Sequence, residues 1–273
     1  MVGGGAGSED VAVGAIVGAP FLLATVAFSL VAGSAYAFRS RRATGVEIAA
    51  DLTTFRRDVA YFVLLFAAAV GLGLGAPEPL QLAGAVVLVA VYAVYAIQTV
   101  RSPGVVAEEQ ELETLYVDTS RGDPPNRLQI AGQLAIGLGL IVGGAHLFVE
   151  EVLHVAEQVG IAPLVLSLVL APFATELPEK ANSFLWIRQG KDALALGNIT
   201  GAMVFQSALP VAIGLVFTDW RLRTPSLLAA GLAFAGAALA YLAIARRRRA
   251  GPLAILGWGL LYAVFVAYVV ANS

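Results

Sequence analysis

Eight long apolar runs divide the sequence, and short segments between them hold most of the charged residues. Each run has about 20 residues or more, which is the length that an α-helix needs to cross a bilayer. The runs fall at 10–38, 58–76, 79–100, 128–149, 160–187, 193–218, 225–245 and 252–271. This pattern predicts an all-α membrane protein with about eight transmembrane helices.

Composition supports this prediction and removes several classes of function. Hydrophobic residues make up 59% of the chain and charged residues only 13%, about half of what a soluble domain carries. The absence of cysteine excludes disulfides, thiolate nucleophiles and cysteine-ligated metals. No basic stripe resembles a nucleic-acid surface, so the lipid bilayer is the expected environment and no nucleic-acid partner is expected.

Basic residues orient the runs, because cytoplasmic loops are enriched in lysine and arginine. The loops after the first, third, fifth and seventh runs are basic, and the intervening loops are poor in basic residues. Both termini are therefore expected outside, with the first run crossing inward and the sixth crossing outward. The basic residues of the first of these loops are Arg39, Arg41, Arg42, Arg56 and Arg57.

An internal repeat joins the two halves of the chain. The segment GSEDVAVGAIVGA at 7–19 aligns without gaps with GKDALALGNITGA at 190–202, and 79–95 aligns with 252–268. Because the two segments of the first pair are expected to cross in opposite directions, the repeat has inverted topology, an architecture of many secondary transporters. The sequence thus predicts an inverted-topology repeat antiporter fold.

The two repeats differ in length, because the runs at 128–149 and 160–187 have no counterpart ahead of the first run. The expected organisation is a partial first repeat of three transmembrane helices (1–100), an acidic cytoplasmic linker (101–127) and a complete second repeat of five (128–273). This N-terminally incomplete fold has three explanations: a misplaced start, a fragment, or a partner chain that supplies the missing helices.

The stretch APFATELPEK at 171–180 is unusually polar for a membrane segment. Pro172 and Pro178 cannot donate helical hydrogen bonds, so they are expected to break the ladder and free the carbonyls of Leu168 and Ala174. Freed carbonyls inside a membrane need protein, water or an ion as a partner. The stretch is therefore a candidate ion site.

Two carboxylates follow the first proline on one helical face, because Glu176 and Glu179 are three residues apart. Together with the Thr175 hydroxyl they offer the oxygen ligands that Ca²⁺ prefers, and intramembrane carboxylates are functional candidates by default. The alternative is a structural ion pair, since Glu176 and Lys180 stand at i and i+4. Side chains from the next run that can complete the site are Asn198 and Gln206.

Both histidines lie near the end of the fourth run, where His146, Glu150 and His154 recur every four residues. Such a stripe can bind a transition metal or hint at an intramembrane hydrolase. No second histidine-bearing segment or HExxH motif supports either reading. The expectation is therefore that the protein is not an enzyme and holds no resident cofactor.

The segments ATELPE at 174–179 and GNITGAMVFQ at 197–206 resemble paired motifs of the calcium/cation antiporter superfamily, which contains the Na⁺/Ca²⁺ exchangers. GAIVGAPFLL at 14–23 is a weaker copy of the second motif. By this resemblance Glu179 matches the central ion-binding carboxylate, Thr175 a hydroxyl ligand and Pro172 a carbonyl-contributing position. Gln206 stands where the family has Asn or Asp.

Other positions depart from the family pattern. Glu176 replaces a serine, and Ala19, Pro20 and Leu23 take the places of polar residues in the first repeat. The resemblance implies a secondary active cation antiporter, with Na⁺/Ca²⁺ exchange by alternating access around a midplane carboxylate site in a prokaryotic inner membrane. Inorganic cations are then its substrates. The alternatives are an H⁺-coupled or other-cation antiporter, a non-transporting fragment or partner subunit, and an intramembrane hydrolase.

Overall fold

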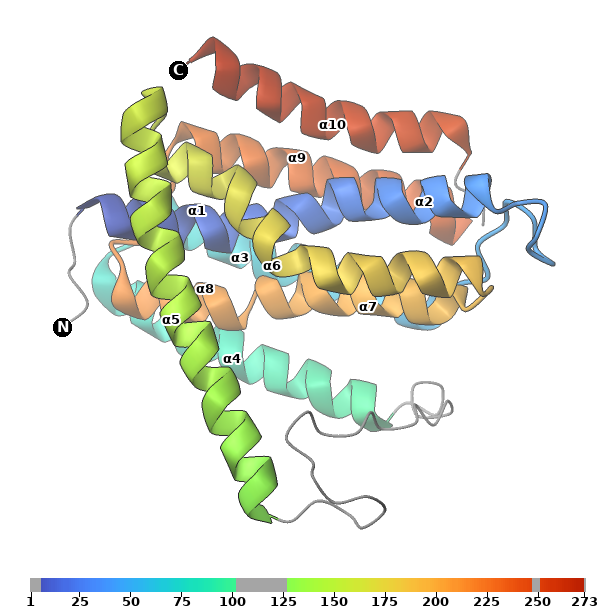
Figure 1. The fold of residues 1–273 in the computed structure, drawn as a ribbon, viewed down its shortest axis with the longest axis horizontal. Coiled ribbons are helices and arrows are strands. Elements are labelled where there is room, and N and C mark those ends of the chain that lie inside the picture. The colour runs from blue at the N-terminus through green and yellow to red at the C-terminus, as the bar shows by residue number, and fades with distance from the viewer. Residues whose placement is uncertain (1–5, 102–126, 247–250, 273) are drawn as a thin grey trace.

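The computed structural model describes residues 6–101, 127–246 and 251–272, without the side chains of Ala6, residues 177–179 and Ala181. Every regular element in these ranges is helical, which confirms the all-α prediction (Figure 1). The elements, in which η denotes a π-helical turn, are α1 Ala6–Leu22, η1 Leu23–Ala27, α2 Phe28–Ala37, α3 Leu52–Gly73, α4 Glu78–Arg101, α5 Arg127–Val159, α6 Pro163–Arg188, α7 Asp192–Gln206, α8 Leu209–Phe217, α9 Thr224–Ala240, η2 Tyr241–Arg246 and α10 Pro252–Ala271.

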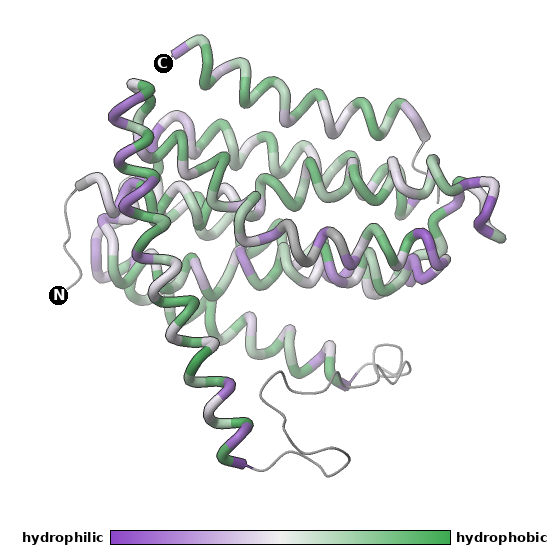
Figure 2. The backbone as a smooth tube through the Cα atoms, viewed as in Figure 1, coloured by the Kyte–Doolittle hydropathy of each residue, from purple (hydrophilic) through white to green (hydrophobic). Residues whose placement is uncertain are grey.

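Six of the helical segments in the described residues are long and apolar enough to cross a membrane. They are 7–37, 78–101, 127–159, 192–217, 224–246 and 252–271. Figure 2 shows the helices mostly hydrophobic along their lengths, with hydrophilic residues gathered toward the loops. The protein is therefore a multi-pass membrane protein, while the expected number of eight spans stays a prediction.

Two predicted boundaries differ from the structure for local reasons. Helix α3 begins at Leu52, several residues before the expected start at 58, because the Asp51 side chain accepts hydrogen bonds from the backbone N–H groups of Thr53 and Thr54, a helix N-cap. Arg56 and Arg57 therefore lie in α3 and not in the loop. The run at 193–218 is divided into α7 and α8 at residues 207–208, next to Pro210.

The inverted repeat is visible in how the helices pack. Helix α3 packs against α7 as α9 packs against α1, and α4 packs against α8 as α10 packs against α2. In Figure 1, α1 and α7, α3 and α9, and α4 and α10 each run in opposite directions. The contacts of the first three segments are thus reproduced by the last three with the direction of the chain reversed.

Irregular features occur at equivalent places in the two repeats. The alignment that places residue 7 over residue 190 also places Leu23 over Gln206. A π-helical turn begins at Leu23, and α7 ends at Gln206. In both repeats the central helix therefore loses its regular α-helical hydrogen bonding at the same position.

An acid near the start of each central helix is paired with an arginine from another part of the chain. Asp192 of α7 accepts a hydrogen bond from Arg42, which precedes α3. Asp10 of α1 is 3.0 Å from Arg223, which directly precedes α9. The first pair is fully buried, and the Arg223 side chain of the second is 65% exposed.

Helices α5 and α6 fall outside this symmetry. α6 packs closely against α1, and α5 crosses the bundle obliquely with contacts to α1 and α6 (Figure 1). Only Val152 and Ala156 of α5 are buried. Most of the predicted linker, residues 102–126, lies outside the described residues, so the division at 101–127 stays a prediction.

The buried pair gives a stability prediction. Arg42→Ala leaves Asp192 buried, with the Ala49 N–H as its remaining hydrogen-bond partner among the described residues. Breaking a buried pair in this way costs about 3–5 kcal/mol. We expect a large fall in the melting temperature of the detergent-solubilised protein, followed by tryptophan fluorescence.

The matched control is Arg223→Ala, which removes the exposed Arg223–Asp10 pair and is expected to cost less than about 1 kcal/mol. Equal falls in melting temperature for the two variants would contradict the assignment of Arg42–Asp192 as the pair that stabilises the fold.

Candidate cation-binding site

The close approach of α1 to α6 positions the candidate site. Gly14 and Gly18 of α1 are buried against α6. A Cβ atom added at either glycine would lie 2.5 Å from a backbone carbonyl oxygen of α6, that of Leu164 or Leu168. Small residues at this spacing allow membrane helices to come into backbone contact, and here only glycine fits.

Polar groups of the two helices meet within this contact. Ser167 donates a hydrogen bond to the Val11 carbonyl at 2.7 Å. The Leu168 carbonyl, whose helical donor is missing because residue 172 is proline, lies against Gly18. This carbonyl therefore serves the helix contact, where a Cα–H of glycine can approach it.

The prolines do not interrupt α6 as the sequence suggested. The helix continues from Pro163 to Arg188 through both Pro172 and Pro178, and Figure 1 shows it changing direction along its length. A proline removes one hydrogen bond of the ladder, and neighbouring helices hold the remaining turns in place. The consequence is a bent helix with no break.

Glu176 is the centre of the polar contacts between α6 and α7. It is 3% exposed, and its Oε1 accepts a hydrogen bond from Gln206 Nε2 at 2.8 Å (distance between the heavy atoms). Its Oε2 is 3.4 Å from Lys180 Nζ, one turn further along α6. The Glu176–Lys180 ion pair that the i, i+4 spacing indicated is therefore present, and Gln206 joins it from α7.

The other predicted residues are placed less centrally. Asn198 donates to Ser183 of α6 at 3.1 Å, closer to the loop between α6 and α7. Thr175 is exposed and donates to the Ala171 carbonyl of its own helix, and Pro172 is buried beside Gly18. The side chain of Glu179 lies outside the described residues. The structure thus brings together Glu176, Gln206 and Lys180, with Asn198 on the same α6–α7 interface.

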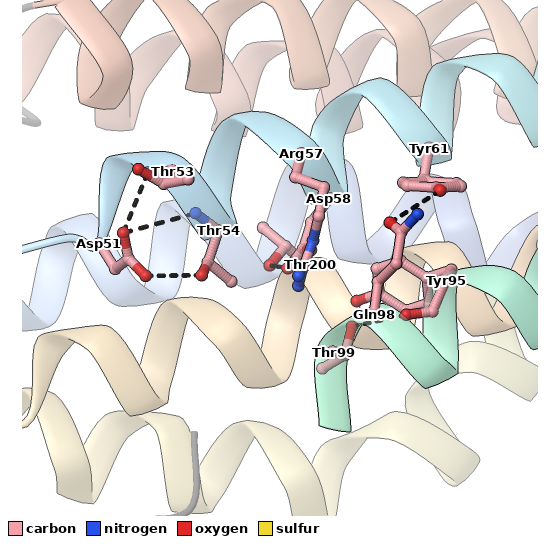
Figure 3. A network of polar contacts seen from close by, with 10 residues as sticks. All are labelled: Asp51, Thr53, Thr54, Arg57, Asp58, Tyr61, Tyr95, Gln98, Thr99 and Thr200. Atoms are coloured by element: carbon pink, nitrogen blue, oxygen red, sulfur yellow. Dashed lines mark hydrogen bonds and ion pairs between the residues drawn. The ribbon is translucent and has the colours of Figure 1, made fainter. Parts of the chain in front are cut away.

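A second polar group, which the sequence did not reveal, lies on the other side of α7 (Figure 3). Asp58 of α3 is 2% exposed, accepts a hydrogen bond from Thr200 at 2.7 Å and pairs with Arg57. The ring of Tyr95 packs against the Arg57 guanidinium. In the sequence Asp58 is visible as an acid at the edge of an apolar run. Its partner Thr200 is 142 residues away, so no local pattern connects the two residues.

These residues line a cavity of about 340 Å³ between α3, α4 and α7. Asp51 lies at its α3 N-terminal end, where the Thr54 hydroxyl and the backbone N–H groups of the first turn hold the pKa of the Asp51 carboxyl below its usual range. The α7 part of the wall includes Leu194, Gly197 and Gly201. This wall is built from the same glycine spacing that α1 presents to α6.

The histidine stripe does not form a metal centre in the described part of the chain. His146 is 3.4 Å from Glu150, and both side chains are more than 60% exposed on α5. His154 contacts Gln158 of its own helix. Among the described residues no group of three His, Asp or Glu side chains is arranged to hold a metal ion.

Comparison with protein families gives the assignment. The family described as sodium/calcium exchanger protein matches residues 130–271, which is just over half of the chain. The chain belongs to this exchanger family. The matched region contains α6 and α7, the two helices that carry the Glu176 site.

Two curated relatives of this exchanger-family chain share a shorter segment. This chain is 34% identical over 83 residues to a putative antiporter, CaxA, of Alkalimonas amylolytica. It is also 34% identical over 84 residues to the sodium/calcium exchanger MaX1 of Methanosarcina acetivorans. The aligned segments cover 30% and 31% of this chain and 26% and 24% of the relatives. The match therefore spans about a quarter of each relative's length.

Solved structures share the fold over nearly the whole chain. The structure of native YfkE matches with a TM-score of 0.67 at 11% identity, covering 94% of this chain and 75% of that one. A crystal structure of the H⁺/Ca²⁺ exchanger CAX matches with a TM-score of 0.58 at 17% identity, covering 96% and 71%. These matches confirm the inverted-repeat antiporter fold.

The α1–α6 contact gives the second prediction. Gly14→Val would drive a branched side chain into the Leu164 carbonyl and the Ser167 side chain, and we expect overpacking to cost about 1–3 kcal/mol or more. The measurement is the melting temperature of the purified protein.

The control is Gly33→Ala in α2, because nothing lies within 4 Å of a Cβ added there. Replacing a helical glycine by alanine at an open position is expected to stabilise by up to about 1 kcal/mol. A Gly14→Val variant as stable as Gly33→Ala would show that α1 and α6 are not in backbone contact.

Proposed function

We propose that the protein is a secondary active antiporter that exchanges Ca²⁺ for Na⁺ at a midplane site between α6 and α7. Glu176 and Glu179 supply the carboxylates, Gln206 and Asn198 amide oxygens, Thr175 a hydroxyl and Pro172 a backbone carbonyl. The observation that carries the proposal is the buried Glu176 carboxylate, held from α7 by Gln206.

The energetics of a buried carboxylate support an ion-related role. A charged side chain inside a membrane costs several kcal/mol unless it is paired, and Glu176 is paired with Lys180 within its own helix. A cation that enters the site competes with the Lys180 ammonium for the same carboxylate oxygens. The amide oxygen of Gln206 then contributes to an all-oxygen ligand set of the kind that Ca²⁺ prefers. Asn198 stands eight residues away on α7, about 12 Å along the helix, so its amide oxygen contacts the ion at a different point of its path.

The architecture supports alternating access. Inverted repeats allow two related packings around a fixed site, and the site lies where the helices of the two repeats meet. Here α6 contacts α1 of the first repeat and α7 of the second. Ions of opposite gradients that compete for the same carboxylates are exchanged when the two packings interconvert.

The names of the relatives support transport and leave two coupling ions to compare. One relative is named a putative antiporter and another a sodium/calcium exchanger, whereas a structural neighbour is named an H⁺/Ca²⁺ exchanger. Exchange against H⁺ is the second candidate, favoured by the buried Glu176–Lys180 pair, which has two groups able to carry a proton. We place the protein in a prokaryotic inner membrane, with inorganic cations as substrates and no resident cofactor.

Calcium flux tests the site. In proteoliposomes with an outward Na⁺ gradient we expect Ca²⁺ uptake that Glu179→Gln reduces at least tenfold, because one ligand charge is lost. Glu150→Gln on exposed α5 is the matched control and keeps wild-type flux. Normal Ca²⁺ flux in Glu179→Gln would refute the site. Loss of flux in Glu150→Gln would show that a carboxylate of α5 takes part in transport.

The driving gradient identifies the coupling ion. Uptake that follows an imposed Na⁺ gradient and is absent with a pH gradient alone supports Na⁺ coupling. Uptake with the pH gradient alone identifies H⁺ coupling. No Ca²⁺ uptake with either gradient would contradict Ca²⁺ exchange and leave an antiporter of another cation or a non-transporting subunit.

A further inference from the structure

An open groove of about 430 Å³ lies between α2, the end of α6 and α10. Its wall includes Leu30, Gly33 and Ala37 of α2 and Gly259 and Tyr262 of α10. A Cβ added at Gly33 or Gly259 meets nothing within 4 Å. The two glycines therefore leave the groove open where α2 packs against α10.

The wall of this groove is mostly hydrocarbon. Ser29 donates a hydrogen bond to the Ile255 carbonyl at 3.4 Å, and Ser34 donates to the Leu30 carbonyl at 2.6 Å. The hydroxyl protons of both serines in the wall are thus already used. The other side chains that line the groove are aliphatic or aromatic, and among the described residues no charged side chain lines it. Because an apolar surface of this kind binds apolar groups most favourably, the expected occupant is a hydrocarbon chain.

The length of the groove matches one leaflet of a bilayer. Along the helix its wall runs from Val26 to Ala37, which at 1.5 Å per residue is about 16 Å. The hydrocarbon core of a bilayer is about 30 Å thick, so the groove spans roughly half of it. Figure 1 shows the ends of α2 and α6 and the start of α10 on one side of the bundle, and Ala37 is the last residue of α2. One acyl chain that enters from this side fits the groove.

A guanidinium lies beside this end of the groove. Phe184 of α6 lines the groove, and its ring meets the Phe38 ring edge to face, with the ring centroids 5.4 Å apart. The Arg188 guanidinium lies over the same Phe38 ring, 5.8 Å from its centroid. An arginine–aromatic contact of this kind holds the cation in place without using its N–H donors.

A second guanidinium follows the end of α2. Arg39 stands two residues after Ala37, lies 4.4 Å from the centroid of the Tyr36 ring and donates one hydrogen bond to the Tyr36 carbonyl. Arg39 and Arg188 are both exposed, and among the described residues no carboxylate lies within ion-pair distance of either. Their remaining N–H groups can therefore bind a phosphate, for which the planar guanidinium fork is suited.

The expected membrane position of the two arginines agrees with a lipid ligand. They follow the first and fifth apolar runs, whose loops are expected on the cytoplasmic side because they are basic. Anionic lipids give that membrane surface a negative potential, and basic pockets between transmembrane helices bind their headgroups. The groove and the two guanidiniums thus supply the two parts of one phospholipid site, a hydrocarbon groove and a phosphate contact.

We propose that the groove between α2, α6 and α10 binds an anionic phospholipid. One acyl chain lies along Gly33 and Gly259, and the phosphate contacts Arg188 and Arg39. The bound lipid joins α2 of the first repeat to α6 and α10 of the second. The proposal goes beyond the proposed function, because lipid binding does not depend on which ion is carried.

Lipid binding to the purified full chain tests the headgroup contact. Native mass spectrometry in a non-ionic detergent is expected to show phosphatidylglycerol bound at least tenfold more tightly than zwitterionic phosphatidylcholine. An Arg39→Gln, Arg188→Gln double variant should lose at least tenfold in phosphatidylglycerol affinity, since each arginine near an anionic lipid contributes roughly fivefold.

The matched control for this double variant is Arg101→Gln, Arg127→Gln. It removes the same charge from exposed helix ends outside the groove and is expected to keep wild-type affinity. Equal loss in the two double variants would show a general attraction to basic residues and would overturn the proposal. Equal affinity of the wild type for the two lipids would overturn it as well.

Filling the groove tests the acyl-chain contact. Gly33→Leu and Gly259→Leu place a side chain in the groove from α2 and from α10, and each is expected to weaken phosphatidylglycerol binding at least fivefold. Gly231→Leu on α9 is the matched control, because Gly231 is exposed and nothing lies within 4 Å of a Cβ added there. Wild-type affinity in either groove variant would overturn the proposal.

A competition measurement separates a lipid from a free phosphate. Glycerol phosphate carries the phosphate without the acyl chains, and in large excess it is expected to leave phosphatidylglycerol bound. Displacement of the lipid by glycerol phosphate would indicate a site for a free anion and would overturn the proposal. None of these measurements involves ion flux, so failure here is distinguishable from failure of the antiport assignment.

Discussion

The backbone contact between α1 and α6 at Gly14 and Gly18 is the constraint on which the rest of the arrangement depends. It leaves no room for a Cβ, and it fixes where the second half of α6 meets α7. Glu176 reaches Gln206 because α6 is held in this place and is bent rather than broken. The candidate site therefore rests on close helix packing more than on any one polar bond.

The inverted repeat places similar local features in the two halves of the molecule. Each central helix changes its hydrogen bonding at an equivalent point, and each carries an acid near its start that an arginine from another part of the chain neutralises. The Arg42–Asp192 pair is buried and the Arg223–Asp10 pair is exposed. The first pair therefore stabilises its end of the bundle more than the second stabilises the other end. The glycines show the same asymmetry, because Gly14 and Gly18 of α1 lie against the α6 backbone, whereas among the described residues no backbone approaches Gly197 or Gly201 of α7 in this way.

The helices, the inverted repeat and the Glu176–Lys180 pair were predictable because each depends on the spacing of residues along the chain. The apolar runs predicted the helices, the aligned segments predicted the inverted repeat, and the i, i+4 spacing predicted the Glu176–Lys180 pair. Contacts between distant residues were not predictable, because no local pattern marks Asp58 as the partner of Thr200. The effect of Pro172 was misjudged, since the neighbouring helix that keeps α6 continuous is a tertiary feature. The oblique course of α5 likewise has no signal in its own sequence.

The central claim is that the carboxylates of α6 bind the transported cation. Its most direct test is calorimetric titration of Ca²⁺ into the purified protein. The account predicts that a Glu176→Gln, Glu179→Gln double variant weakens binding at least tenfold, which corresponds to about 1.4 kcal/mol or more. It also predicts that the matched Glu150→Gln, Glu151→Gln variant on α5 binds as the wild type does. Equal Ca²⁺ affinity in the wild type and the α6 double variant would contradict it.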